Sequence, residues 1–381
     1  MEQLKKGYKK TEVGVIPADW IPTYISQIAK ITTGASDTQD KIEDGQYPFF
    51  VRSQNIERIN KYSFNCEAIL TSGDGVGVGK IYHYIDGKFD FHQRVYCLYD
   101  YHPLLHGKYL FYQFSTNFYN RVMAMTAKSS VDSVRREMIS NMLIAIPPTL
   151  TEQKAIAEAL TDVDELITNL EKFIAKKKAI KQGAMQQLLT PPHKGGKRLG
   201  GFSGDWVEVR LGDLSQIKTG GKNNQDKVKD GEYPFFVRSQ NVEKINSYCY
   251  DGEAILIPGE GGIGTIFHYI NGKFDVHQRV YKISDFESNC FGKFIYLKLL
   301  NGFYNHAMKN SVKATVDSLR LPTFLEFKIE LPPTLDEQIA ISKVVFDLDF
   351  ELEMMEKKMN KCIAIKQGMM QELLTGKTRL I

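Results

Sequence analysis

The sequence predicts an α+β protein with two similar mixed α/β domains separated by two long antiparallel coiled-coil helices, an internal tandem repeat with pseudo-two-fold symmetry. Three observations predict this fold class. A long stretch of sequence occurs twice, each copy opens with strand-like and helix-like segments, and each copy closes with apolar residues in a heptad pattern. At 381 residues the chain is long enough for two domains with cores of their own.

The two copies of the repeat share one long identical segment and several shorter ones. The nine residues YPFFVRSQN occur at Tyr47–Asn55 and again at Tyr233–Asn241. The shorter matches EAIL, HQRVY, VDS, PPTL and AIKQG follow in the same order in both copies. A repeat of this length exceeds the periods of about 20 to 50 residues that are typical of solenoids, so each copy is a whole domain with its connector.

The repeat divides the chain into five predicted segments. These are a first mixed domain at 1–148, a long helix at 149–190, a linker at 191–205, a second mixed domain at 206–333, and a second long helix with the C-terminal tail at 334–381. The linker contains several Pro and Gly residues, which interrupt helices.

The composition of each domain predicts both strands and helical structure. Four segments of the first copy have strand composition and are bounded by Gly, Asp or Asn: Tyr47–Val51, Ala68–Thr71, Lys80–Ile85 and Phe91–Leu98. Lys108–Met125 and Lys293–Lys309 carry apolar residues at helical spacing, which predicts one or two helices in each copy.

The segment after each PPTL has a heptad pattern surrounded by Lys and Glu. Its apolar residues recur at alternating steps of four and three, which is typical of a coiled-coil packing surface. The predicted helix–helix interface consists of Ile156, Leu160, Val163, Ile167, Leu170, Ile174, Ile341, Val345, Leu348, Leu352, Met355 and Met359. Since the two stripes are duplicates, we expect them to pack on each other within the chain.

Composition excludes some classes of protein. Lys and Arg total 49 against 45 Asp and Glu, a slight basic excess that permits nucleic-acid binding without requiring it. No run approaches the roughly 18 apolar residues of a membrane span, and the N-terminus is polar, so we expect a cytoplasmic protein without membrane contact. The five cysteines form no CxxC pair, which argues against a metal site or a disulfide framework.

A glycine-rich loop occurs in each copy, at Gly73–Gly79 and Gly259–Gly264. Neither loop has the spacing of a phosphate-binding P-loop, because Gly79-Lys80 is followed by Ile81 and the second copy has Thr265 in place of the lysine. Tight backbone turns that approach a DNA backbone are the favoured interpretation.

Two polar segments of each copy can recognise base edges. Arg can bond to guanine O6 and N7, and Gln can bond to adenine N6 and N7. The candidate residues are Arg52, Ser53, Gln54, Asn55, His92, Gln93 and Arg94 in the first copy, and Arg238, Ser239, Gln240, Asn241, His277, Gln278 and Arg279 in the second. The alternative is structural, with the arginines bracing a neighbouring loop.

A further set of polar residues suits phosphate contacts, although solvated surface charge is the alternative. The set contains Lys128, Ser129, Ser130 and Arg135 in the first copy and Lys313 and Arg320 in the second. No catalytic or metal-binding residues are predicted, since the chain has no GxSxG or HExxH motif and no cysteine shared between the copies.

The opening Lys10–Trp20 (KTEVGVIPADW), the segments YPFFVRSQN and DGKFDFHQRVY, and the helical segments PPTLTEQKAIA and AIKQGAMQQLLT resemble specificity subunits of bacterial type I restriction-modification systems. The resemblance covers essentially the whole chain. It implies that 1–148 and 206–333 are target-recognition domains, each for one half of a split double-stranded DNA target, and that the helices are conserved spacers which dock methyltransferase subunits and fix the spacing.

The resemblance also implies a non-catalytic subunit without a cofactor of its own. The partners would be two modification (methyltransferase) subunits and ATP-dependent restriction subunits that translocate and cleave DNA, so S-adenosylmethionine, ATP and Mg would be bound there. Because the two domains are closely similar, we predict a near-palindromic target. The copies diverge at Ser72–Asp74 against Pro258–Glu260 and at Ala35–Asp40 against Gly221–Asp226.

Two other classes of function remain open at this point. One is a coiled-coil scaffold whose domains bind protein, and the other is a self-contained methyltransferase or NTPase, which would need motifs that the sequence lacks. A DNA-recognition subunit would bind DNA sequence-selectively and with a steep salt dependence, whereas a coiled-coil scaffold would not.

Overall fold

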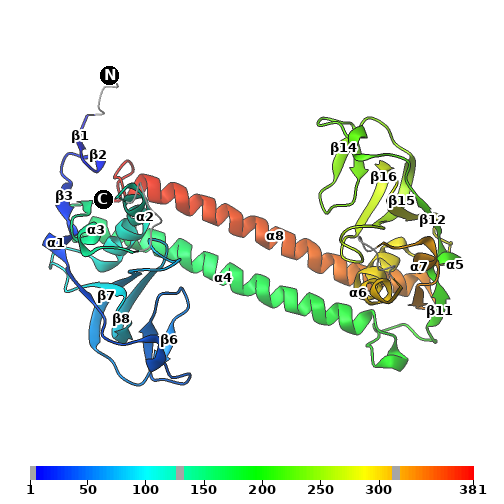
Figure 1. The fold of residues 1–381 in the computed structure, drawn as a ribbon, viewed down its shortest axis with the longest axis horizontal. Coiled ribbons are helices and arrows are strands. Elements are labelled where there is room, and N and C mark those ends of the chain that lie inside the picture. The colour runs from blue at the N-terminus through cyan, green and yellow to red at the C-terminus, as the bar shows by residue number, and fades with distance from the viewer. Residues whose placement is uncertain (1–5, 126–132, 311–317) are drawn as a thin grey trace. The chain divides into compact units, whose positions relative to one another are not determined.

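The computed structural model describes residues 6–125, 133–310 and 318–381. The chain forms two compact units, of which the first comprises Met1–Glu171 and Lys357–Ile381 and the second Lys172–Glu356. Two long helices, α4 (Leu150–Leu188) and α8 (Leu335–Leu373), each contribute one part to each unit (Figure 1). Within the described ranges, none of the helices has the length and apolar content that crossing a membrane requires.

A six-stranded mixed sheet forms the centre of the first unit, in the order β4-β9-β7-β8-β5-β6. Its strands are β4 (Lys30–Thr33), β5 (Tyr47–Phe50), β6 (Glu57–Ile59), β7 (Phe64–Ser72), β8 (Tyr82–Phe91) and β9 (Val95–Tyr99). β5 and β8 run parallel, and the other neighbours run antiparallel. The last five residues of β7 are all buried, so this central strand is covered on both faces.

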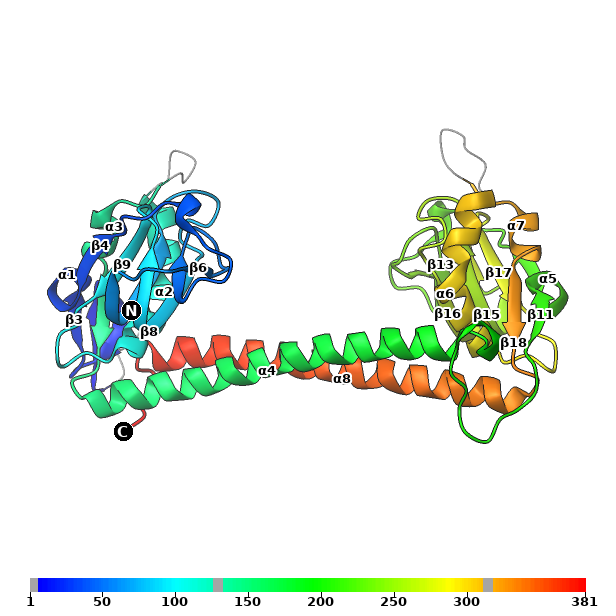
Figure 2. The ribbon, with the colours of Figure 1, turned by 90° about the horizontal axis from the view of Figure 1, so that it is seen from below.

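Helix α2 (Gly107–Met125) packs against β7 and β8 (Figure 2). Its Leu110, Phe114, Phe118 and Val122 are each 0% exposed, because residues four apart lie on one face of a helix. The helix predicted at Lys108–Met125 is therefore confirmed. The smaller elements of the unit are α1 (Ile25–Ile28), α3 (Arg136–Ser140), the strand pair β1 (Tyr8–Thr11) with β2 (Gly14–Pro17), and the strand pair β3 (Ile21–Tyr24) with β10 (Leu143–Ile146).

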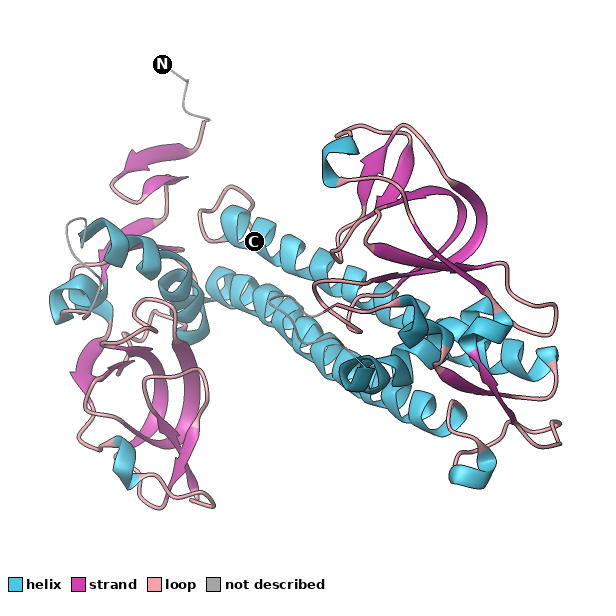
Figure 3. Cartoon of the chain, turned by 45° about the vertical axis from the view of Figure 1, so that its right-hand side comes forward, coloured by secondary structure: helices cyan, strands magenta, loops and turns pink. Residues whose placement is uncertain are grey.

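The second unit repeats this architecture and likewise combines strands with helices (Figure 3). Its sheet has the order β12-β17-β15-β16-β13-β14. Its strands are β12 (Gln216–Thr219), β13 (Tyr233–Phe236), β14 (Glu243–Ile245), β15 (Tyr250–Pro258), β16 (His268–Val276) and β17 (Val280–Ser284). The remaining elements are α5 (Leu211–Leu214), α6 (Gly292–Asn310), α7 (Leu321–Leu325) and the strand pair β11 (Val207–Arg210) with β18 (Lys328–Leu331). The helix predicted at Lys293–Lys309 is confirmed by α6.

The single strand predicted at Phe91–Leu98 is wrong in its middle. β8 ends at Phe91 and β9 begins at Val95, and the chain turns between them. The turn is held by long-range contacts, since Gln93 N donates to Ser36 O at 2.9 Å. Composition indicated a strand because the residues on both sides are strand formers, whereas the turn depends on a partner far away in the sequence.

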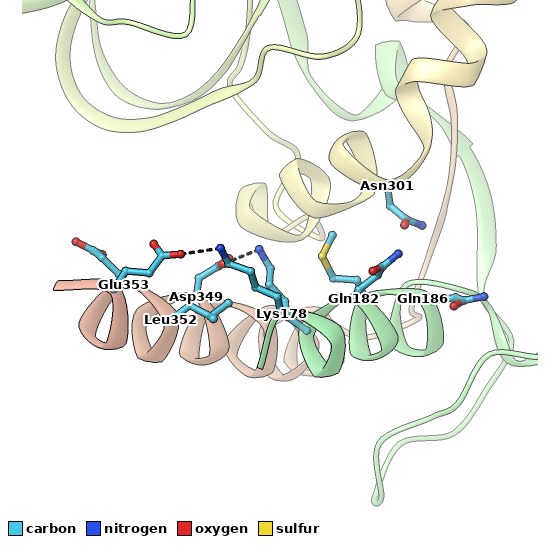
Figure 4. A pocket seen from close by; sticks show the side chains of 10 residues that line it. Lys178, Gln182, Gln186, Asn301, Asp349, Leu352 and Glu353 are labelled. Carbon is cyan, nitrogen blue, oxygen red and sulfur yellow. Dashed lines mark ion pairs between the residues drawn. The ribbon is translucent and has the colours of Figure 1, made fainter. Parts of the chain in front are cut away.

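Parts of α4 and α8 pair antiparallel within the second unit. Lys178 Nζ lies 2.8 Å from Glu356 Oε1. Further along α4, Lys181 Nζ lies 2.5 Å from Asp349 Oδ1, so the residue number falls on α8 as it rises on α4 (Figure 4). In the first unit the corresponding ion pair joins Lys366 to Asp164.

The twelve side chains predicted to form the helix–helix interface are all buried or half-buried. Ile156 and Leu160 share a buried cluster with Leu373 in the first unit. In the second unit, Ile341 shares a buried cluster with Leu188. The two repeated mixed domains and the two long helices are thus as predicted, while the coiled-coil geometry, the pseudo-two-fold relation and the five segment boundaries stay predictions.

The C-terminal end of each long helix is held by a polar side chain from the domain helix beside it. Gln113 on α2 donates from Nε2 to Leu374 O at 2.7 Å. At the equivalent place in the second unit, Lys298 on α6 donates from Nζ to Leu189 O at 2.9 Å. Burial lowers the pKa of Lys298 to about 8, because an ammonium group loses solvation in the protein interior.

We expect Lys298→Gln, which copies Gln113, to stabilise the second unit at neutral pH. The unfolded chain binds the Lys298 proton with an ordinary pKa of 10.5 and the folded chain with a pKa of about 8. The destabilisation caused by burying the charged Lys298 is therefore fully present below pH 8 and fades as the pH rises towards 10.5. At about 1.4 kcal/mol per pKa unit, removing it should add on the order of 1–3 kcal/mol to the free energy of unfolding at pH 7.

Urea denaturation from pH 7 to 10 measures this effect as the difference in the free energy of unfolding between wild type and variant. The difference should shrink as the pH rises. A difference that is constant with pH would contradict a buried charged lysine.

Candidate nucleic-acid interface

The strand register brings three loops of the first unit together. Phe50, the last residue of β5, pairs with Phe91, the last residue of β8, in parallel, so the residues that follow both strands lie at one edge of the sheet. Ser72, the last residue of β7, pairs with Val95, the first of β9. The RSQN segment, the HQR turn and the glycine-rich loop therefore meet, although they are far apart in sequence.

The two arginines of this loop cluster share one carboxylate. Arg52 Nη1 donates to Asp74 Oδ1 at 2.9 Å, and Arg94 Nη1 donates to Asp74 Oδ2 at 2.9 Å. The Asp74 side chain is 15% exposed, whereas those of Arg52 and Arg94 are 43% and 63% exposed. Burial by itself raises the pKa of Asp74, but the hydrogen bonds from the two arginines outweigh it and hold this pKa below its ordinary value.

The second unit has the same arrangement with a longer acid. Arg238 Nη1 and Arg279 Nη1 lie 3.1 Å from the two carboxylate oxygens of Glu260. Backbone bonds fix the glycine-rich loop in the same way in both units, since Gly73 N donates to Arg94 O and Gly259 N to Arg279 O, each at 2.8 Å. The extra methylene of Glu260 leaves the pairing of two arginines with one carboxylate intact.

The histidines of the HQR segments lie inside the protein. His92 is 3% exposed and His277 is 4% exposed. His92 Nδ1 accepts a hydrogen bond from Arg94 N at 2.9 Å, and His277 Nδ1 accepts one from Arg279 N at 3.0 Å. Each ring therefore braces the turn that carries the neighbouring glutamine and arginine.

The glutamines of the HQR segments are exposed, and each is held by a residue from a fourth loop. Gln93 Nε2 donates to Asp37 Oδ2 at 2.9 Å. Gln278 Nε2 lies 2.5 Å from Asn223 Oδ1. Asp37 and Asn223 precede the short 3-10 helices η1 (Thr38–Asp40) and η3 (Asn224–Asp226).

The RSQN segments form matching loops in the two units. Ser53 Oγ donates to Asn55 O at 2.9 Å, and Ser239 Oγ donates to Asn241 O at the same distance. A buried histidine contacts each loop. In the first unit, His83 Nε2 lies 3.0 Å from Ser53 O. The side chains of Gln54, Asn55, Gln240 and Asn241 are exposed.

Of the residues predicted to contact phosphate, the structure describes Arg135 and Arg320, and both are exposed. Each follows a segment that bonds to the glycine-rich loop, since Val134 N donates to Gly73 O and Leu319 N donates to Gly259 O, each at 2.7 to 2.8 Å. Lys128, Ser129, Ser130 and Lys313 lie outside the described residues.

In the second unit the loop cluster surrounds a hollow in the surface. Its lining consists of Asn223, Asn224, Gln225, Arg238, Glu260, His277, Gln278 and Arg279. The exposed groups are guanidinium and amide groups, which donate hydrogen bonds to phosphates and base edges. The described residues include no group of three or more His, Cys, Asp and Glu side chains placed to hold a metal ion.

Four acceptors of the loop clusters were not among the predicted site residues: Asp37, Asn223, Asp74 and Glu260. In the sequence these positions stand out only as places where the two copies diverge. Their role depends on contacts between separate loops, which local sequence patterns do not reveal.

The sequence is similar to specificity subunits of type I restriction enzymes. The chain is 25% identical to the type I restriction enzyme MjaVIII specificity subunit of Methanocaldococcus jannaschii over 96% of this chain and 94% of that one. It is 30% identical to the type I restriction enzyme EcoDI specificity subunit of Escherichia coli, over 44% of this chain and 36% of that one.

A solved structure has the same fold. The S subunit of a type I restriction-modification system from M. genitalium superposes with a TM-score of 0.72 at 18% identity, covering 97% of each chain. The family model described as the type I restriction modification DNA specificity domain matches twice, at residues 17–182 and 203–362. These two matches contain both loop clusters and most of both long helices, and the chain therefore belongs to the type I restriction-modification specificity family.

Proposed function

We propose that this chain is the DNA-recognition subunit of a type I restriction-modification complex, and that each unit recognises one half of a bipartite, near-palindromic target. The observation that carries the proposal is that both units contain the same cluster of hydrogen-bond donors. In each cluster two arginines pair with one carboxylate, next to the turn that carries an exposed glutamine. Guanidinium and amide groups form the bidentate contacts that distinguish guanine and adenine in the major groove.

Within each cluster we assign different roles by exposure. Gln93, Arg94 and their equivalents Gln278 and Arg279 are exposed and suited to contact bases. The buried histidines position these side chains through the turn. Arg135 and Arg320 suit phosphate contacts, which orient a protein on the duplex without recognising its sequence.

The long helices have a separate role in this proposal. α4 and α8 form an antiparallel coiled coil that relates the two domains by a pseudo-two-fold axis, matches the dyad of an inverted target and sets the spacer between its halves. The helices also dock two modification subunits. Methyl transfer, ATP hydrolysis and DNA cleavage then belong to partner subunits that bind S-adenosylmethionine, ATP and Mg, in the cytoplasm, and this chain is non-catalytic.

The test is a map of methylated bases in cells that encode the chain and in the same cells after its deletion. We expect an inverted split motif, with methyladenine in each half, that disappears on deletion. A split motif with unrelated halves would contradict the near-palindromic target only. A map unaffected by deletion would contradict DNA recognition and favour the scaffold alternative.

The same map tests the helices. A heptad inserted after Ile174 and another after Met359 keeps the antiparallel pairing in phase, since seven residues restore the same helix face. We expect a longer spacer and unchanged half-sites. Changed half-sites would show that the helices contribute to base recognition.

A further inference from the structure

The two loop clusters carry equivalent glutamines, proposed above to contact bases, but hold them by different chemical groups. Gln93 lies 2.9 Å from a carboxylate oxygen of Asp37. Gln278 lies 2.5 Å from the side-chain amide of Asn223. The two acceptors occupy the same position in the repeat, immediately before η1 and η3.

A carboxylate fixes the orientation of the Gln93 amide. An ionised carboxylate only accepts hydrogen bonds, so the Gln93 atom that faces Asp37 has to be Nε2 and cannot be Oε1. Asp37 also accepts from Thr38 N at 2.6 Å and lies 3.5 Å from His92 Nε2. The hydrogen bond from Thr38 N contributes most to lowering the pKa of Asp37, which keeps the group ionised at neutral pH.

The amide of Asn223 does not fix Gln278 in this way. A side-chain amide presents an oxygen acceptor and a nitrogen donor of nearly the same size and shape. The contact between Asn223 and Gln278 is satisfied with either amide supplying the donor. Turning both amides by half a turn therefore exchanges the outward donor and acceptor of Gln278 and keeps their mutual hydrogen bond.

The order of donor and acceptor decides which base edge an amide matches. Adenine presents its N6 donor beside its N7 acceptor, and an amide bonds to both only when its oxygen faces N6 and its nitrogen faces N7. A turned amide instead matches an edge that presents these groups in the opposite order. An amide held in one orientation is selective, and one that turns tolerates more than one base.

We propose that Asp37 and Asn223 are positioning residues that determine specificity. Asp37 makes the first unit selective for a single base at the position that Gln93 contacts. Asn223 lets the second unit accept more than one base at the position that Gln278 contacts. This inference rests on the proposed function and refines it. The two half-sites differ at this one position, where the first half demands a single base and the second accepts alternatives. The shared arginines recognise the same bases in both halves.

The chain itself supplies matched variants. Asp37→Asn gives the first unit the acceptor of the second, and Asn223→Asp makes the reverse change. Asp37 N donates to Asp40 Oδ2 at 2.8 Å and Asn223 N donates to Asp226 Oδ2 at 2.7 Å, and neither bond involves the exchanged side chain, so each exchange retains the local fold. Thr38→Asn, which copies Asn224 on the same short helix, changes the neighbouring side chain without altering the partner of Gln93, and serves as the control.

The experiment is selection from a randomised DNA duplex library by the full chain, purified with the subunits that accompany it, followed by sequencing of the bound DNA. For wild type we expect one position of one half-site to be discriminated about tenfold more strongly than its partner in the other half. Asp37→Asn should reduce that discrimination by about tenfold. Asn223→Asp should raise discrimination at the partner position by a similar factor, and Thr38→Asn should change neither.

The outcomes separate this inference from the proposed function. A wild-type complex that selects no DNA sequence would overturn the proposed function. A selected split motif whose base preferences are the same in Asp37→Asn and Asn223→Asp would overturn only the inference. A variant that raises or lowers affinity equally for all sequences would also overturn it, because such an effect reflects phosphate repulsion rather than base recognition.

Discussion

Replacing both arginines of the first loop cluster is expected to lower the affinity for the cognate duplex by about 100-fold or more. One bidentate contact to a base discriminates by about 1–3 kcal/mol, and Arg52→Ala with Arg94→Ala removes two candidates. The double variant also leaves Asp74 without its two partners on the proposed DNA-binding surface. An ionised carboxylate there repels phosphate, so the loss should exceed the sum of the two single variants.

Fluorescence anisotropy with the duplex defined by the methylation map measures this affinity at fixed salt. Arg238→Ala with Arg279→Ala should produce a loss of the same size through the other half-site. Lys30→Ala is the control, because Lys30 pairs with Asp100 at the opposite end of the β4–β9 strand pair. We expect the control to stay within about threefold of wild type.

The alternative role of the arginines, bracing a neighbouring loop, gives a different result. If they only brace the fold, the double variant would lose thermal stability and keep its affinity at temperatures where it remains folded. If they contact phosphate alone, the affinity would fall equally for every sequence and the salt dependence would become shallower. Either result would contradict base recognition by this cluster.

Arg379→Ala is expected to destabilise the first unit by about 3–5 kcal/mol, the usual cost of leaving a buried charge without its partner. Arg379 Nη2 donates to Glu152 Oε2 at 2.8 Å, and the Glu152 side chain is 1% exposed. Arg379 also contacts Asp19, with 3.0 Å between Nη1 and Oδ1. The C-terminal tail thus neutralises a glutamate in the first turn of α4.

Urea denaturation of the full chain measures this loss, and the second unit offers a matched site. Arg198 Nη2 donates to the fully buried Glu337 at 2.7 Å, so Arg198→Ala should have a similar effect on that unit. Lys343→Ala removes an exposed pair with Asp347 and should cost less than about 0.5 kcal/mol.

A double variant identifies the cause of the loss. Glu152→Met combined with Arg379→Met removes both charges, and it should recover most of the stability that Arg379→Ala loses. If the double variant is as unstable as Arg379→Ala, the loss comes from packing of the tail and not from the uncompensated carboxylate of Glu152.

Much of the candidate site could be predicted because the same polar segments occur in both copies of the repeat. The identical RSQN and HQR segments singled out the exposed Gln93 and Arg94 and their equivalents. The same reasoning could not separate these from His92, which is buried, because identity between copies reflects structural and functional residues alike. The acceptors Asp37 and Asp74 were missed, since each acts on a loop distant in sequence.

The sequence by itself determined the duplicated organisation, the mixed α/β domains, the α2 and α6 helices and the apolar stripes of α4 and α8. These features follow from local composition and from periodicity along the chain, which act over a few residues. Tertiary structure alone decided that the HQR segment is a turn, that two arginines share Asp74, and that Arg379 neutralises Glu152. Each of these depends on strand register and burial between residues far apart, and local preferences do not encode such contacts.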